Sequence, residues 1–229
     1  RDCLLSRGLG DVYKRQVVLR HLAVSALVEL GGGKVSNCLV HPSVRQASHD
    51  IFARDISKEL QWCKEHIDDE FKAEFTAVYD GLAPVKYSKA SVSDAFGKAK
   101  DLLTSNAVKI LIMNGKNAIS SDQYSTGANI VIGGNTLGRG VTFPSLHTIY
   151  YTRTAKKPQA DTMWQHSRMF GYDRDPGLMM VYIDEPLYKL FSDINATNNS
   201  LIAQVESGTD HIKVYYPNCL LYTSPSPRD

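Results

Sequence analysis

The sequence lacks three features that would assign it to a special class: a large net charge, a cysteine pattern and a long apolar run. Its 229 residues carry a formal net charge of +2, which favours no strongly charged partner. None of the four cysteines has the spacing of a disulfide framework or a zinc site. No apolar run reaches the ~18 residues of a membrane span. These absences predict a cytoplasmic protein with no metal site and no membrane partner.

The two ends of the chain do not read as natural protein. Residues 6–16 back-translate to a transposon adapter used in sequencing libraries, and residues 219–229 to its complementary strand in another frame. Two natural termini would not encode complementary strands, so we expect residues 1–16 and 219–229 to be translated adapter. Residues 1–16 hold an excess of two basic side chains, so the remaining chain is close to neutral. The predicted natural divisions are a helical lead-in at 17–35, the main domain at 36–206 and the start of a following segment at 207–218.

Strand-like runs alternate with helix-like runs along the natural part of the chain. Val17 to Leu30 is apolar on most faces and ends in consecutive glycines, which predicts a buried helix with a glycine stop. Apolar residues at three- and four-residue steps predict one long amphipathic helix from Ser43 to Val78. Further helices are predicted at Ser91–Ser105, Gln159–Phe170 and Leu187–Val205, and strands at Asn37–Val40, Val108–Met113, Ile130–Ile132, Thr148–Tyr151 and Leu178–Ile183. This alternation predicts an α/β fold, a parallel sheet of about five strands sandwiched by helices.

The loop after the third predicted strand is rich in glycine. Residues 133–140 read Gly-Gly-Asn-Thr-Leu-Gly-Arg-Gly. Ligands of parallel sheets bind beyond the carboxyl ends of the strands, and glycines let backbone N–H groups approach an anion closely. Arg139 adds a fixed positive charge. The loop is therefore a candidate anion site, although a plain turn explains the glycines equally well.

A second candidate site lies in the predicted helix at Gln159–Phe170 and just beyond it. Gln165 and Arg168 are three residues apart and share one face of a helix, while Gly171 and Arg174 continue into the next loop. A guanidinium keeps its charge and binds oxygens in a fixed fork, which suits it to a phosphoryl group in transit. A solvated helix end is the alternative interpretation.

These parts stand in the order found in the second RecA-like domain of superfamily-two helicases. Arg139-Gly140 resembles the end of the fifth helicase motif, and a short hydrophobic strand follows at His147 to Tyr151. Gln165, Arg168 and Gly171 are loosely similar to the sixth motif. The resemblance implies a RecA-like fold and an ATP site shared with another domain.

The chain resembles the Z-one domain family, named as an endonuclease family, more closely still. Ile132 to Thr142 and Gln165 to Tyr172 follow that family's two patterns, and Leu39 to Ser43 is similar to its strand ending in V-H-x-S. Asp173 departs from the pattern by separating Tyr172 from the next arginine. Asn135 stands where many helicases carry an aspartate near the nucleotide sugar.

The resemblance implies a division of labour with a missing N-terminal RecA-like domain of the same full-length chain. That domain would make most of the contacts to ATP and Mg, and this one would bind DNA, with RNA as an open alternative. The implied process is bacterial DNA restriction or phage defence. The implied catalytic residues are Arg168, Arg174 and Gln165. The implied nucleotide-binding residues are Gly138, Arg139, Gly140 and Gly171. The implied nucleic-acid contacts are His41, Ser43, Gly134, Asn135 and Thr136.

Two other functions stay open. The domain could itself be a metal-dependent DNA endonuclease, using Asp68, Asp69, Glu70 and Lys72 and the pair Asp184-Glu185. The first cluster lies inside a helical pattern, which favours a solvated face, and Asp184 is suited to cap the following helix. The third function is a non-catalytic RecA-like module that binds DNA or a protein. A phosphate loop within the chain is disfavoured, because Val35 rather than Ser or Thr follows the Gly-Gly-Gly-Lys run.

Overall fold

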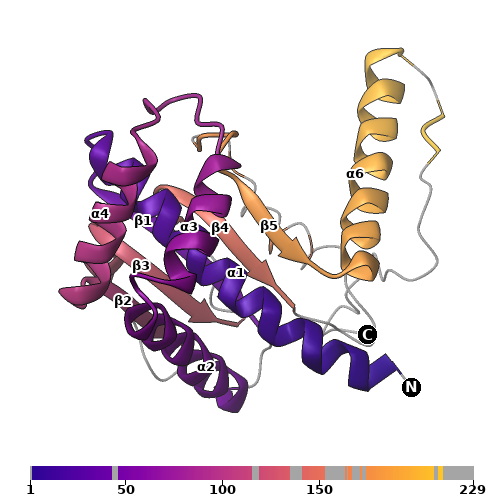
Figure 1. Cartoon of the computed structure of the whole chain (residues 1–229). Coiled ribbons are helices and arrows are strands. Elements are labelled where there is room, and N and C mark those ends of the chain that lie inside the picture. Colours follow the sequence, from indigo (N-terminus) through magenta and orange to yellow (C-terminus); the bar gives the residue numbers. More distant parts are fainter. Residues whose placement is uncertain are drawn as a thin grey trace.

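The computed structural model describes residues 2–42, 46–114, 119–134, 141–152, 163, 165–166, 171, 174–208 and 211–213. The strands in these parts are β1 (Val35–His41), β2 (Val108–Met113), β3 (Gly127–Gly133), β4 (Leu146–Tyr151) and β5 (Met180–Ile183). The helices are α1 (Asp2–Leu30), α2 (Gln46–Glu65), α3 (Glu70–Asp80), α4 (Val92–Thr104) and α6 (Glu185–Glu206), with a short 3-10 helix, η1 (Ser121–Tyr124). Figure 1 shows their arrangement.

The five strands form one parallel sheet in the order β2-β3-β1-β4-β5. β1 lies in the middle, and the chain passes from β1 to β2 through α2, α3 and α4, with β3 between the two strands. Parallel neighbours require such crossovers, which are usually helical. The predicted α/β fold with a five-stranded parallel sheet is confirmed, and the arrangement is consistent with a RecA-like domain.

The sheet has two apolar faces, as alternation along buried strands requires. Cys38 and Val40 of β1 and Ile130 of β3 pack in one core cluster with side chains of α1, α2, α3 and α4. Leu39 and Val131 point to the opposite face and pack in a second cluster. In Figure 1 the four helices lie together on one side of the sheet.

α1 is a core helix rather than a surface helix. Every residue from Val17 to Val28 is buried, because α1 lies between the sheet and the helices α3 and α4. The prediction of a buried helix ending at Leu30 is confirmed, although the helix begins earlier, at Asp2. Burial starts at Val17, whereas Tyr13 is exposed. The interpretation of residues 1–16 as adapter stays a prediction.

The single long helix expected from Ser43 to Val78 is wrong, because the chain breaks it into α2 and α3. The break lies at the turn after Glu65, where the N–H groups of Asp69 and Phe71 both donate to the His66 carbonyl oxygen. The change of direction buries Phe71 and Phe75, which pack against Phe96 of α4 with ring centroids 5.7 and 5.6 Å apart. Tertiary packing of aromatic rings therefore decides the direction of α3.

The ends of α4 and α6 follow from local chemistry. The Ser91 hydroxyl accepts the Asp94 N–H at 3.1 Å, as an N-cap residue does. Asp184 stands at the predicted N-cap of α6, although its side chain makes no capping hydrogen bond. Leu178, predicted as the start of the fifth strand, instead closes a turn on the Asp175 carbonyl. The helix predicted at Gln159–Phe170 lies mostly outside the described residues.

None of the helices in the described ranges is both long and apolar enough to cross a membrane.

Candidate functional site

The carboxyl ends of β1, β3 and β4 bring His41, Gly133 and Tyr151 together. The strand register pairs His41 with Tyr151, and Val40 with Ile132, so that Gly133 follows directly beside His41. Because the strands are parallel, their carboxyl ends lie at one edge of the sheet, the usual place for ligands. Both side chains are buried, with His41 2% and Tyr151 1% exposed.

Three aromatic rings form a closed cluster at this edge, which we call the ring cluster: His41, Tyr151 and His166. The centroid of the His41 ring lies 4.9 Å from that of Tyr151 and 4.8 Å from that of His166. Tyr151 and His166 are 5.8 Å apart by centroid. The Tyr151 hydroxyl is hydrogen-bonded to His166 Nδ1 at 2.8 Å. The cluster therefore joins two strand ends to the segment that carries Gln165.

The His41 imidazole has a fixed orientation and tautomer. Its Nδ1 lies 2.7 Å from the Gly133 carbonyl oxygen. A carbonyl oxygen only accepts hydrogen bonds, so Nδ1 must carry the proton. In the neutral ring Nε2 is then the acceptor, and in the charged ring it is a second donor. His41 thereby ties the end of β1 to the start of the glycine-rich loop.

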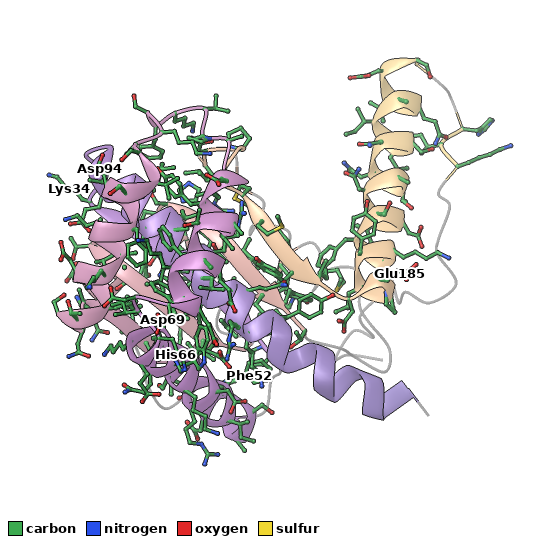
Figure 2. The ribbon with its side chains drawn as sticks, viewed as in Figure 1. Lys34, Phe52, His66, Asp69, Asp94 and Glu185 are labelled. Carbon is green, nitrogen blue, oxygen red and sulfur yellow. The ribbon has the colours of Figure 1, made fainter. Side chains whose placement is uncertain are left out.

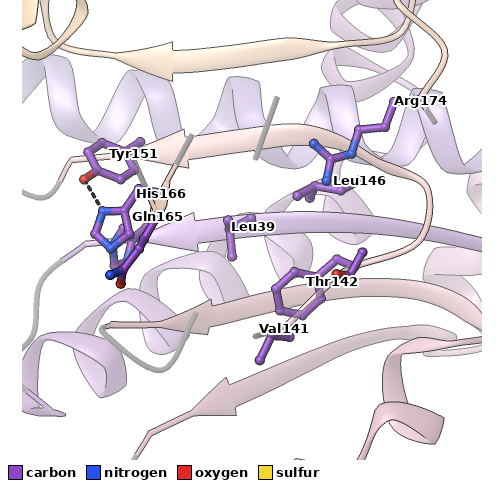
Figure 3. Close-up of a pocket in the computed structure, with 10 residues that line it drawn as sticks. Leu39, Val141, Thr142, Leu146, Tyr151, Gln165, His166 and Arg174 are labelled. Carbon is purple, nitrogen blue, oxygen red and sulfur yellow. Dashed lines mark hydrogen bonds between the residues drawn. The ribbon is translucent and has the colours of Figure 1, made fainter. Parts of the chain in front are cut away.

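A pocket on the face of the sheet that carries Leu39 extends from the ring cluster to the amino-terminal half of β4 (Figure 3). Its lining combines polar side chains with an apolar floor and consists of Leu39, His41, Val141, Thr142, Phe143, Leu146, Tyr151, Gln165, His166 and Arg174. Its volume is about 40 Å³, far below the roughly 300 Å³ at which ligand pockets usually begin. The described residues thus hold space for a few waters rather than for an enclosed nucleotide.

Of the predicted site residues, His41, Gly134 and Gln165 lie at the carboxyl edge. Arg174 also lines the pocket, but at its other end, beside Leu146 (Figure 3). Its side chain is buried, with 6% exposed. The structure therefore separates Arg174 from Gln165, with which the sequence grouped it. Gly171 is partly buried, and the other predicted site residues lie outside the described residues: Ser43, Asn135, Thr136, Gly138, Arg139, Gly140 and Arg168.

Sequence reasoning missed Tyr151 and His166. Tyr151 is the last residue of a predicted strand and His166 directly follows the predicted site residue Gln165, so both lie next to features that the sequence does reveal. Nothing in the sequence pairs the two side chains, because their hydrogen bond depends on how the segment around Gln165 sits on the sheet.

Polar side chains are also buried at the amino-terminal ends of the strands. Asn37 of β1 donates to the carbonyls of Tyr124 and Pro144 at 3.0 and 2.6 Å, and its own oxygen accepts from Asn129 of β3 at 3.0 Å. These bonds hold the connections that lead into β3 and β4. Here side chains satisfy backbone groups that the strands leave open.

Asp175 clamps two loops at the same end of the sheet. Its carboxylate accepts the backbone N–H groups of Val85, Lys86 and Gly177 at 2.6 to 3.0 Å. Burial raises the pKa of this carboxyl, but the N–H donors of Lys86, Val85 and Gly177 lower it, and the net pKa lies below its usual value. Asp175 is therefore charged and structural.

His21 of α1 lies fully buried beside His147 of β4. Burial, and secondarily the neighbouring imidazole of His147, lowers the pKa of His21 to about 3. Neither ring nitrogen of His21 has a hydrogen-bond partner among the described residues. The ring is therefore neutral in the folded protein.

The two acidic groups of the endonuclease alternative, residues 68–72 and 184–185, do not form one site. Asp68 lies in the turn between α2 and α3 and is paired with Lys100 at 2.9 Å. Asp69 and Glu185 lie well apart in Figure 2. Within the described part of the chain, no three acidic, histidine or cysteine side chains are placed to hold one metal ion.

Comparison with known proteins gives one relationship. The chain matches the Z1 domain, the family that the sequence patterns resemble, over residues 18–214. No curated protein and no solved structure matches the chain. The matched residues include the whole sheet, the ring cluster and the segment around Gln165. The chain therefore belongs to the Z1 domain family.

Proposed function

We propose that this chain is the second RecA-like half of a nucleic-acid-dependent ATPase, and that it closes against a further RecA-like domain of the same polypeptide. The proposal places the chain in bacterial DNA restriction or phage defence, with DNA as the ligand. ATP and Mg are held mainly by the other domain. The small volume of the pocket, about 40 Å³, is in keeping with that division.

The observation that carries the proposal is the convergence of three segments at one edge of the sheet. His41 ends β1, Gly133 and Gly134 begin the glycine-rich loop, and Gln165 lines the same pocket as His41. These segments are the counterparts of the fourth, fifth and sixth helicase motifs in the sequence resemblance. All three therefore stand at the edge where parallel sheets bind ligands, as the proposal requires.

In this proposal each segment has its own task. The segments that hold His41, Ser43, Gly134, Asn135 and Thr136 lie against the nucleic-acid backbone, and the buried His41 ring fixes the end of β1 beneath it. Arg168 meets the terminal phosphate of ATP, where a permanently charged guanidinium stabilises the charge that develops during phosphoryl transfer. Gln165 positions the attacking water. The remaining nucleotide contacts are Gly138, Arg139, Gly140 and Gly171.

Arg174 has a weaker place in the proposal as a second arginine of the ATP site. Its position beside Leu146, away from Gln165, suits a structural role at least as well.

ATP turnover by the natural full-length protein tests the proposal. Arg168→Ala should lower turnover by about 10³-fold or more, the usual effect of removing such an arginine. Arg54→Ala is the matched control, because Arg54 is exposed on α2, and it should keep wild-type turnover. Wild-type turnover in the Arg168 variant, or no ATP hydrolysis by the wild type, contradicts the proposal. Magnesium-dependent nicking of plasmid DNA by this chain alone would instead support the endonuclease alternative.

A further inference from the structure

The ring cluster joins segments with different tasks in the proposed function. His41 belongs to the segment that contacts nucleic acid, while His166 adjoins Gln165 of the ATP-site segment. Tyr151 of β4 contacts both.

The three rings are buried and in contact with one another. All three centroid distances lie between 4.8 and 5.8 Å, and exposure is 2% for His41, 1% for Tyr151 and 7% for His166. Close-packed protein interiors transmit displacements rather than absorb them. A shift of the His41 ring must therefore displace the His166 ring or be resisted by it.

Two hydrogen bonds fix the ends of this contact. The His41 Nδ1–H donates to the Gly133 carbonyl at 2.7 Å, so His41 follows the start of the glycine-rich loop. The Tyr151 hydroxyl holds His166 Nδ1 at 2.8 Å, so His166 follows the rigid end of β4. Tyr151 also packs against Phe191 of α6, with centroids 5.6 Å apart. The sheet thus supplies a fixed support against which the two imidazoles meet.

We propose that His166 and Tyr151 are positioning residues that couple the nucleic-acid segment to the ATP-site segment: DNA bound over the carboxyl end of β1 shifts the buried His41 ring, and the ring cluster passes this shift to the placement of Gln165. This coupling rests on the proposed ATPase function. It assigns Tyr151 and His166 a role in activation by DNA, distinct from the hydrolysis step itself.

The test uses the natural full-length protein and compares ATP turnover with and without saturating double-stranded DNA. The ratio of the two rates is the activation factor. Tyr151→Phe removes only the hydroxyl and should lower the activation factor by at least about fivefold, the lower end of typical coupling between sites. Tyr188→Phe is the matched control, because Tyr188 is 64% exposed on α6, and it should leave the factor unchanged.

Two variants of His166 separate coupling from mere packing. His166→Leu keeps an apolar side chain but no polar atom, and should lower the activation factor at least as much as Tyr151→Phe does. His166→Asn places an amide near the position of Nδ1, so it should restore part of the factor although it fills the space less well. A purely structural role predicts the opposite order, with the leucine variant closer to the wild type.

The outcomes distinguish the coupling from the function on which it rests. If the wild type hydrolyses no ATP, the proposed function and the coupling both fall. If the wild type is activated by DNA, and Tyr151→Phe and His166→Leu keep the full factor with unchanged melting temperature, only the coupling falls. Turnover that does not respond to DNA in the wild type also overturns the coupling. Should His166→Leu fail to fold, Tyr151→Phe and His166→Asn decide the question.

Discussion

The two ends of the sheet both bury polar side chains, but they use them differently. At the amino-terminal end, Asn37, Asn129 and Asp175 bond to backbone groups of the connecting loops. At the carboxyl end, Tyr151 bonds to His166, and their rings pack against His41 beside a pocket. The first arrangement only fastens the chain to itself. The second also does so, through the bond of His41 to the Gly133 carbonyl, but it leaves side chains of several segments facing one space. Buried polarity alone therefore does not mark a functional site; the partners of the polar atoms do.

The largest effect should come from crowding the amino-terminal clamp, the hydrogen bonds of Asp175 to the backbone of Val85, Lys86 and Gly177. A Cβ atom added at Gly177 would lie 1.6 Å from the Ala83 carbonyl oxygen, so Gly177→Ala must move backbone and should destabilise the fold by about 4 kcal/mol or more. Gly97→Ala in α4 is the control, because its Cβ would meet nothing within 4 Å, and it should stabilise the helix by about 0.5 to 1 kcal/mol. Urea unfolding measures both. Similar unfolding free energies for the two variants would show that the close approach of Gly177 to Ala83 does not contribute to stability.

The charge of Asp175 should matter next. Asp175→Asn puts an amide N–H₂ group where backbone N–H groups donate, and we expect a loss of about 2 to 3 kcal/mol at pH 7. The exposed Asp122→Asn should change little. Because the pKa of Asp175 is lowered in the folded state, its contribution is complete above the unfolded pKa of about 3.9 and is lost as the pH falls through that value toward the folded pKa. A plot of unfolding free energy against pH, from pH 7 to pH 3, should therefore have a smaller slope in Asp175→Asn than in the wild type.

Much of the fold follows from the sequence, and the remainder shows where local signals end. The strands are predicted because each is a short apolar run between turn residues, and Ser91 marks the start of α4 because capping is local. The break before α3 is missed because apolar residues keep helical spacing across it, while Phe71 takes its direction from Phe96.

The site is predicted only in part for the same reason. His41 and Gln165 are found from patterns along the chain. The bond of Tyr151 to His166 and the distance of Arg174 from Gln165 are properties of the folded chain, because they depend on how segments far apart in sequence meet.

Acidic pH should expose the cost of the buried His21. The unfolded chain binds a proton at this residue below a pH of about 6.5, whereas the folded chain does so only near pH 3, the value to which the pKa of His21 is lowered. Stability is therefore complete above pH 6.5 and falls as the pH drops below it, by about 2 kcal/mol at pH 5.

His21→Leu should abolish this part of the pH dependence. His211→Leu, at an exposed position, should retain it. Equal slopes of unfolding free energy against pH in the wild type and His21→Leu would show that the ring titrates normally in the folded state.

The smallest effect on stability should come from the carboxyl end. Tyr151→Phe removes one hydrogen bond and should cost about 1 kcal/mol, half or less of the loss expected for Asp175→Asn. Thermal unfolding beside Tyr188→Phe measures this difference. A loss as large as that of the Asp175 variant would mean that the ring cluster fastens the fold as firmly as the amino-terminal clamp does.

The buried helix α1 limits where this domain can be excised or fused. Its side chains from Val17 to Val28 fill the space between the sheet and the outer helices. A polypeptide that begins at β1 would expose to water the apolar sides of α3 and α4 that α1 covers, and it would lose the packing contacts of α1, so its fold would be strongly destabilised. Expression boundaries and fusion points must therefore lie upstream of Val17. A protease that cuts between α1 and β1 should leave the two fragments associated, because α1 is buried in the core.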